Sequence, residues 1–229
     1  MTEIERIPWE TFYNGWQWKQ GEHVAIIGPT GCGKTTLLLG ILPKREYVCI
    51  FGTKPVDPTL KALQNSRGYV RMREWSSLDP SMYPKRILWP AADKLRESAI
   101  LQRGEFIHAL ESIYHEGGWC VAIDELWYVT QTLKLTQEVK TYLQQARSLK
   151  ISLVCATQRP ACVPLEIYDQ STYLFLFRDN DERNLKRLSG IGWLSAKLIQ
   201  NTVARLPLHD TLCINTRTGD MTITRPPKV

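Results

Sequence analysis

Short apolar runs recur along the chain and are separated by stretches with helical or loop-like patterns. Most of these runs are nearly continuous apolar residues, without the alternation of apolar and polar positions that marks a half-exposed strand. Continuous runs are typical of parallel strands that helices cover on both faces. We therefore predict an α/β fold with a mainly parallel sheet in its interior. The runs span residues 23–28, 46–51, 119–124, 151–156 and 172–177.

The stretches between these runs predict helices, of which 132–149 shows apolar residues near helical spacing. Close to the C-terminus, runs at 211–215 and 220–225 flank a turn-like segment, 216–219, so we predict a β-hairpin there. The predicted helices span residues 34–42, 93–115, 132–149, 180–189 and 193–204.

The domain organisation follows from the same pattern. Residues 1–22 carry many aromatic side chains at no clean period, and we interpret them as an N-terminal packing extension. We expect residues 23–229 to form a single domain. Within it, the segment from about 53 to 92 is rich in Pro, Gly, Ser and basic residues, and we interpret it as an insertion with candidate strands at 69–75 and 86–89.

Composition narrows the class of protein. The chain has 229 residues, of which 43% are hydrophobic and 23% charged, so a buried core is expected and a disordered or fibrous protein is excluded. No apolar run approaches the ~20 residues that span a bilayer, so the chain is predicted not to be transmembrane. The six cysteines stand singly, which favours a reducing, cytoplasmic location. The net charge of +6 gives modest support for a polyanionic partner.

Residues 28–35 fit the phosphate-binding pattern G-x-x-x-x-G-K-[ST], after a predicted strand and before a predicted helix. A plain glycine turn is the alternative, which this context disfavours. Glycines let backbone N–H groups approach phosphate oxygens at the positive end of the helix. Lys34 would reach the β- and γ-phosphates, Thr35 would supply a hydroxyl ligand to Mg²⁺, and Thr36 would contact the α-phosphate or cap the helix. The predicted ATP-binding residues are Gly28, Pro29, Thr30, Gly31, Cys32, Gly33, Lys34, Thr35 and Thr36.

A second candidate motif is the apolar run that ends in Asp124-Glu125. Two carboxylates after a strand are often only a solvated turn, but with the phosphate loop present they match a Walker B strand. Asp124 would then hold Mg²⁺ through water, and Glu125 would orient and deprotonate the attacking water. The two motifs together predict a Mg²⁺-dependent ATPase with Lys34 and Glu125 among its catalytic residues.

The run at 151–156 leads into Gln158, whose amide can both donate and accept a hydrogen bond and would sense the γ-phosphate or the attacking water. Residues 156–160 read A-T-Q-R-P. Here the sequence resembles the FtsK–HerA superfamily of ring-forming, DNA-pumping ATPases, whose corresponding strand typically ends in these residues.

The resemblance covers about residues 23–191, with its landmarks in the family's order. The chain departs from the family at Gly52-Thr53, where the usual Asp is missing, so Lys54 keeps only a weak claim to a functional contact. After the phosphate loop, the landmarks are I-F-G-T-K-P at 50–55 where the family often has D-P-K, Asp124-Glu125, Arg147 at a helix end, A-T-Q-R-P at 156–160, F-L-F-R at 175–178 and D-E-R at 181–183.

We expect neither the membrane domain nor the DNA-reading domain of FtsK in this chain, which looks like the genome-packaging ATPases of tailless, membrane-containing double-stranded DNA viruses. The resemblance implies an ATP-driven translocase that moves double-stranded DNA into a preformed capsid. It also implies a homo-oligomeric ring, a hexamer or a pentamer, that docks on a capsid vertex or a viral membrane protein. Such a motor would work in the host cytoplasm or on the virion.

Ring ATPases of this superfamily complete their site with an arginine from the neighbouring subunit, which stabilises charge on the γ-phosphate. Arg147 ranks first because we expect its helix to end beside the phosphate edge of the sheet. The other candidates are Arg159, Arg178 and Arg183. An ordinary surface or structural salt bridge is an equally good explanation for any one of them.

Positive charge in the inserted region suggests where DNA would bind, because phosphate neutralisation needs charge without strict spacing. Trp75, Tyr83 and Trp89 have the chemistry to stack on bases, but partly buried packing is the commoner role of such residues. The basic candidates are Lys54, Lys61, Arg67, Arg71 and Arg73.

Two other functions remain open from the sequence. A nucleotide-binding switch or kinase would share the phosphate loop, but Glu125 and the lack of a guanine-reading N-K-x-D motif disfavour it. A DNA-pumping ATPase or helicase in conjugation or DNA processing would share all the motifs.

Overall fold

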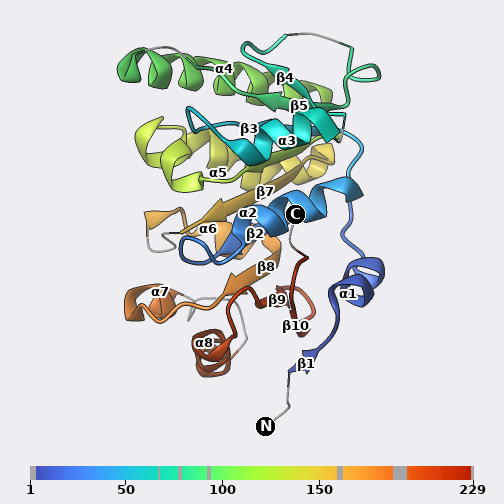
Figure 1. Cartoon of the computed structure of the whole chain (residues 1–229), viewed down its shortest axis with the longest axis vertical. Helices are drawn as coiled ribbons and strands as arrows, with labels where there is room; N and C mark the ends of the chain where they lie inside the picture. The colour runs from blue at the N-terminus through green and yellow to red at the C-terminus, as the bar shows by residue number, and fades with distance from the viewer. Residues whose placement is uncertain are drawn as a thin grey trace.

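The computed structural model describes residues 4–66, 68–76, 79–91, 94–158, 162–187 and 195–227. In this part of the chain ten strands form one sheet in the order β1-β10-β9-β8-β2-β7-β6-β3-β5-β4 (Figure 1). The strands are β1 Glu5–Arg6, β2 His23–Ile27, β3 Val48–Phe51, β4 Val70–Met72, β5 Lys85–Leu88, β6 Cys120–Ile123, β7 Ser152–Thr157, β8 Ser171–Phe177, β9 Thr211–Asn215 and β10 Met221–Thr224.

The strands from β8 to β4 in this order run parallel to one another, with registers such as Ala25 beside Cys155. β9 is antiparallel to both β8 and β10 and forms the predicted C-terminal hairpin with β10. The carboxyl ends of the parallel strands therefore share one edge of the sheet, which we call the carboxyl edge; the opposite edge is the amino edge.

Helices cover both faces of the sheet, as the continuous apolar runs predict (Figure 1). Alternate residues of β2 face opposite sides: Ala25 and Ile27 pack with apolar residues of α4, α5, α6 and α8, whereas Val24 and Ile26 pack with those of α1, α2 and α3. The helices are α1 Trp9–Gly15, α2 Lys34–Ile41, α3 Pro58–Ser66, α4 Leu95–Glu116, α5 Thr136–Gln145, α6 Glu166–Gln170, α7 Glu182–Arg187 and α8 Ala196–Arg205, with short 3₁₀ helices at Leu42–Lys44 and Ala146–Leu149 and a π-helix at Tyr128–Thr132.

The predicted fold class, an α/β P-loop fold with a mainly parallel sheet and a C-terminal hairpin, is confirmed. Each predicted strand is present, and β4 and β5, in the segment interpreted as an insertion, continue the same sheet at its end. The sequence patterns did not reveal β1, α1, α3 or α6. The helix predicted over 132–149 begins later, as α5, because a π-helix ends at Thr132 and Lys134 has a φ of 59°, which an α-helix does not allow.

The N-terminal residues that the structure describes pack onto the sheet. Trp16 stacks on Trp18 with ring centroids 5.3 Å apart and meets Phe175 of β8 edge-on, and the guanidinium of Arg45 lies 3.5 Å from the Trp18 ring centroid. These contacts bury the aromatic side chains that show no period in the sequence, so they act as packing residues.

The state of the cysteines and the character of the helices relate to the predictions of a reducing location and of a chain that is not transmembrane. All six cysteines are described and carry free thiols; Cys162 is exposed and the other five are buried. Among the helices in the described ranges, none combines the length and the apolar character needed to cross a membrane.

Candidate nucleotide-hydrolysis site

The predicted phosphate loop, residues 28–33, joins β2 to α2 at the carboxyl edge of the sheet. The loop requires glycine for two structural reasons, namely lack of space for a side chain and positive φ angles. A Cβ on Gly28 would lie 2.6 Å from Cβ of Phe177 and 2.8 Å from Sγ of Cys32, so no larger residue fits there. Gly31 and Gly33 have φ values of 79° and 112°, which only glycine adopts at little cost.

The loop leads directly into the first turn of α2. The first intrahelical bond runs from the N–H of Leu37 to the carbonyl of Gly33, so the N–H groups of the preceding turn have no partner within the helix. Lys34 lies over the loop, where its Nζ donates to the Pro29 carbonyl at 2.8 Å. Free amides, a helix amino end and an ammonium group together form a site for phosphate oxygens.

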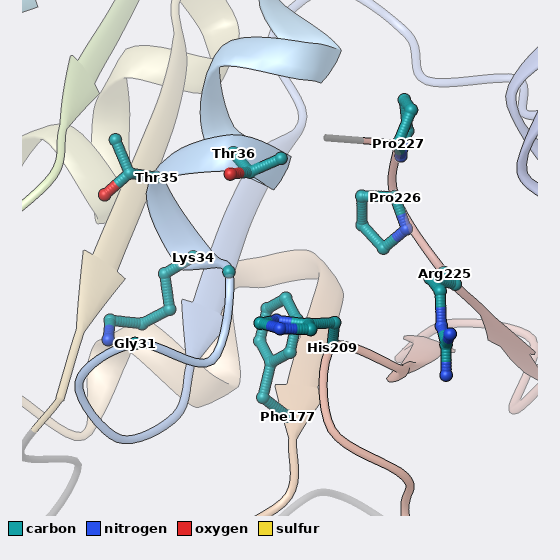
Figure 2. Close-up of a pocket in the computed structure, with 10 residues that line it drawn as sticks. Gly31, Lys34, Thr35, Thr36, Phe177, His209, Arg225, Pro226 and Pro227 are labelled. Carbon is teal, nitrogen blue, oxygen red and sulfur yellow. The ribbon is translucent and has the colours of Figure 1, made fainter. Parts of the chain in front are cut away.

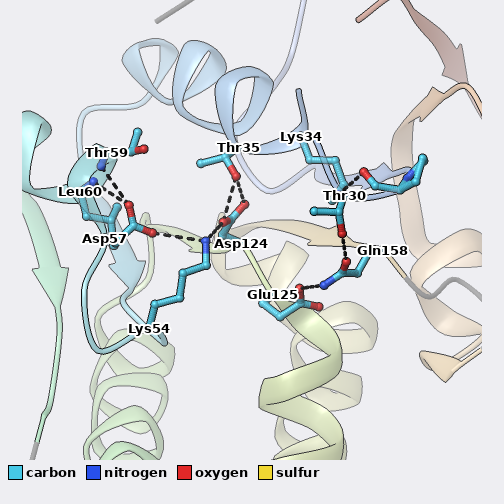
Figure 3. A network of polar contacts seen from close by, with 11 residues as sticks. Thr30, Lys34, Thr35, Lys54, Asp57, Thr59, Leu60, Asp124, Glu125 and Gln158 are labelled. Carbon is cyan, nitrogen blue, oxygen red and sulfur yellow. Dashed lines mark hydrogen bonds and ion pairs between the residues drawn. The ribbon is translucent and has the colours of Figure 1, made fainter. Parts of the chain in front are cut away.

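Asp124 follows β6 and lies against the first turn of α2 (Figure 3). The Thr35 hydroxyl is 2.9 and 3.0 Å from the two carboxylate oxygens of Asp124, and Nζ of Lys54 is 3.3 Å from Oδ2. Asp57 contacts the same Nζ at 3.3 Å. The pair predicted to hold a metal is thus in contact, and hydroxyl and carboxylate oxygens are ligands that suit Mg²⁺.

Glu125 and Gln158 meet beside this cluster, from β6 and β7 (Figure 3). Gln158 donates through Nε2 to Oε2 of Glu125 at 2.7 Å and accepts from the hydroxyl of Thr30. Oε1 of Glu125 is buried without a hydrogen-bond partner in the described residues. Burial raises the pKa of Glu125 above its ordinary value, against the lowering effect of the Gln158 hydrogen bond. A raised pKa suits a carboxylate that accepts a proton near neutral pH.

The loop that carries Lys54 is held by residues that the sequence did not indicate. Nε1 of Trp89 donates to the Lys54 carbonyl at 2.7 Å, and Gln102 donates to the Thr53 carbonyl at 3.3 Å. A Cβ on Gly52 would lie 2.7 Å from the Trp89 ring. Gly52, where the chain lacks the family's usual Asp, is therefore the position against which the Trp89 ring packs. In the sequence, a glycine directly after a predicted strand was the available sign of this close contact.

The structure corrects the expected position of Arg147. Arg147 lies in the 3₁₀ helix that precedes β7, and its carbonyl and side chain lie beside Gly21 at the start of β2. Because strands β2 and β7 are parallel, this is the amino edge, so the expectation that Arg147 lies beside the phosphate edge was wrong. Arg178 follows β8 at the carboxyl edge, and Arg183 lies in α7 just beyond it; both are exposed. Arg159 is outside the described residues.

The residues predicted to contact DNA fall into packed side chains and exposed ones. Arg71 stacks over Trp89, with its guanidinium 4.4 Å from the ring centroid, and Trp75 and Trp89 are buried, so these aromatic rings are packing residues. Lys61 and Arg73 are exposed. Arg67 is outside the described residues.

We compared the sequence with protein families and curated proteins, and the fold with solved structures. A family profile described as ABC transporter matches residues 15–160, whereas no curated protein matches the sequence. Among solved structures, B204, the DNA-packaging ATPase from Sulfolobus turreted icosahedral virus, has a TM-score of 0.66 at 19% identity over 92% of this chain and 100% of its own. B204 from Sulfolobus turreted icosahedral virus 2 in complex with ATP-γ-S has a TM-score of 0.63 at 17% identity, over 90% of this chain and 97% of its own.

VirB4 of Thermoanaerobacter pseudethanolicus has a TM-score of 0.68 at 9% identity over 90% of this chain and 89% of its own. At these identities the likeness is one of fold. The profile covers more than half of the chain, including the loop, Asp124, Glu125 and Gln158. The chain therefore belongs to the ABC transporter family of that profile, and it has the fold of a P-loop ATPase.

Proposed function

We propose that this protein is an ATP-driven double-stranded DNA translocase that packages a viral genome into a preformed capsid. The observation that carries the proposal is the joint placement of the phosphate loop, the Thr35–Asp124 pair and the Glu125–Gln158 pair at one edge of the sheet. The fold likeness to B204, described as a DNA-packaging ATPase, supports the step from hydrolysis to packaging.

In the proposed reaction, Glu125 accepts the proton of the attacking water through its carboxylate, and Gln158 orients that carboxylate and the water. Lys34 leaves the Pro29 carbonyl to bind the β- and γ-phosphates. Thr35 and Asp124 would hold Mg²⁺, which supplies neutralisation of phosphate charge.

The proposed assembly is a homo-oligomeric ring, a hexamer or a pentamer, whose neighbouring subunit supplies an arginine to each site. Arg178 and Arg183 are the proposed donors, because both are exposed and near the carboxyl edge. Mixing Arg178→Ala with Lys34→Ala protein should restore part of the hydrolysis, since one interface then has an intact loop and an intact arginine. Recovery with Arg147→Ala instead would contradict this choice and return the role to Arg147.

The proposed partner is double-stranded DNA, bound through phosphate contacts and without sequence preference. For this contact we propose Lys61 and Arg73, two exposed basic residues of the 53–92 segment. We place the ring in the host cytoplasm, where it would dock on a capsid vertex or a viral membrane protein.

The deciding experiment measures the ATPase rate against added duplex DNA at low and rising salt. Duplex should stimulate hydrolysis, and the stimulation should fall steeply with salt as neutralised phosphates recover their counterions. Lys61→Glu and Arg73→Glu should each reduce the salt slope by roughly one. Lys19→Glu is the matched control, because Lys19 is exposed and precedes β2 at the amino edge.

No stimulation and no DNA binding by the assembled protein would contradict the translocase. In that case a nucleotide-binding switch or kinase becomes the better proposal, since it uses the same loop without duplex.

A further inference from the structure

A cavity of about 360 Å³ opens beside the phosphate loop (Figure 2). This volume lies in the range of about 300–1,000 Å³ that is typical of small-molecule sites. It extends from the first turn of α2, at Thr36, to a wall formed by residues distant in sequence, and none of the motifs used to build the hydrolysis site accounts for that wall. The wall consists of Phe177, His209, Arg225, Pro226 and Pro227.

Strand direction explains why this wall forms next to the loop. Phe177 ends β8 at the carboxyl edge; β9 is antiparallel to β8, so His209, which precedes β9, lies at the same edge. β10 reverses direction again, which brings Arg225 back to it. In the strand order, β2 has β8 on one side and β7 on the other, so the cavity and the pair Glu125–Gln158 flank the loop on opposite sides.

His209 is held against the loop in an unusual backbone conformation. Its φ is 69°, a left-handed value that costs a residue with a side chain free energy and tends to persist where function requires it. Nδ1 lies 3.1 Å from the carbonyl of Cys32. Because a carbonyl only accepts, Nδ1 carries the proton, and in the neutral ring Nε2 is then a hydrogen-bond acceptor. Figure 2 shows the His209 ring beside Phe177, below the first turn of α2.

Arg225 is fixed by a buried carboxylate next to His209. Nε of Arg225 is 2.5 Å from Oδ1 of Asp210, whose side chain is fully buried, and Arg6 of β1 pairs with the other oxygen. Arg225 thus lines the cavity from a defined position, with Pro226 directly after it. A flat cation, an imidazole and a proline ring are the groups on which a planar heterocycle stacks.

We propose that this cavity is the nucleoside subsite of the protein: the base and ribose of the bound nucleoside triphosphate lie between His209 and the Arg225–Pro226 segment, and its phosphates lie on the loop. The inference rests on the proposed function in one respect, namely that the loop binds a nucleoside triphosphate. It adds which residues recognise the part of the nucleotide that takes no part in the reaction.

The test compares Mg²⁺-ATP with inorganic tripolyphosphate, which has the phosphates without the nucleoside, by calorimetric titration. Wild-type protein should bind ATP more tightly than tripolyphosphate. His209→Asn should weaken ATP binding roughly tenfold through loss of the stacking face, and leave tripolyphosphate binding within about twofold. Asparagine tolerates the left-handed backbone and keeps a donor for the Cys32 carbonyl, so this variant removes mainly the ring. Arg225→Ala should show the same pattern.

Arg217→Ala is the matched control: Arg217 lies in the turn at the other end of the β9–β10 hairpin, pairs with Glu22 at 3.0 Å, and should leave both affinities unchanged. Equal affinity of wild-type protein for ATP and tripolyphosphate would overturn the subsite and leave the proposed hydrolysis intact. Equal weakening of both ligands by His209→Asn would also overturn it, because His209 would then act on the loop. Failure of either ligand to bind wild-type protein would overturn the proposed function together with the subsite.

Discussion

The two edges of the sheet use polar side chains differently. At the amino edge several of them satisfy the protein itself, although Nε2 of His23 is buried without a partner in the described residues: Nε2 of Gln20 donates to the carbonyls of Gly118 and Lys150 at 2.8 Å, and the buried Glu22 accepts from the Lys19 N–H and pairs with Arg217. At the carboxyl edge Glu125 keeps a buried oxygen without a partner in the described residues. An unsatisfied carboxylate oxygen beside the phosphate loop is available for a ligand.

Because of this contrast, substitutions at the two edges should affect different properties of the protein. Changes at the carboxyl edge should alter hydrolysis and ligand binding with little effect on folding. Changes at the amino edge should alter the free energy of unfolding with little effect on hydrolysis.

Glu125→Gln should have the largest effect. The amide cannot take a proton from water, so hydrolysis should fall about a thousandfold or more while ATP binding persists. Single-turnover hydrolysis and ATP titration measure the two quantities. Glu111→Gln, an exposed change on α4, is the control. Normal hydrolysis by Glu125→Gln would remove the proposed base.

His23 at the amino edge should control stability in acid. Burial, followed by the nearby positive charge of Arg147, lowers the pKa of His23 from 6.5 to about 4. Below pH 6.5 the unfolded chain therefore binds a proton that the folded chain refuses, and stability falls until the pH reaches about 4, by about 3 kcal/mol in all.

Denaturant unfolding at pH 7 and pH 4.5 tests this, with His23→Asn as the variant that does not titrate. The variant should lose less stability between the two pH values than wild-type protein. His108→Asn, at an exposed position of α4, should behave like wild type. Equal losses for His23→Asn and wild type would show that His23 does not control the acid response.

Lys54→Met should strengthen divalent cation binding severalfold. The Lys54 ammonium lies 3.3 Å from Asp124 and opposes a cation at the same carboxylate, but half of the side chain is exposed, so solvent screens the effect. Mn²⁺ titration followed by electron paramagnetic resonance measures it without turnover. Lys61→Met is the control; unchanged Mn²⁺ affinity in Lys54→Met would show that the two cations do not share Asp124.

Gln158→Ala should shift the acid limb of the hydrolysis rate to higher pH. The Gln158 hydrogen bond lowers the pKa of Glu125, so its loss leaves the burial effect less opposed and the pKa rises further. Glu125 must be ionised to accept a proton, so activity in the variant should appear only at higher pH. A limb that moves to lower pH would contradict the assigned direction of the hydrogen bond.

The sequence predicted those parts of the molecule that are determined by residues close together in the chain. Continuous apolar runs predicted the central strands, and spacing alone found the loop and Asp124-Glu125. α3 was missed because its segment is rich in residues typical of turns, and α1 because its aromatic residues have no period. The position of Arg147 depends on which end of β7 it adjoins, and the wall with His209 and Arg225 depends on two reversals of the chain; neither has a local signature.

The distribution of thiols makes this chain convenient to label. Burial raises the pKa of Cys32, and brings that of Cys49 and of Cys120 to about 12, so these thiols stay protonated and shielded from maleimides. Cys162 alone among the six is exposed, four residues after Gln158. A dye attached there would mark each chain once, close in sequence to Gln158, without prior removal of any other cysteine.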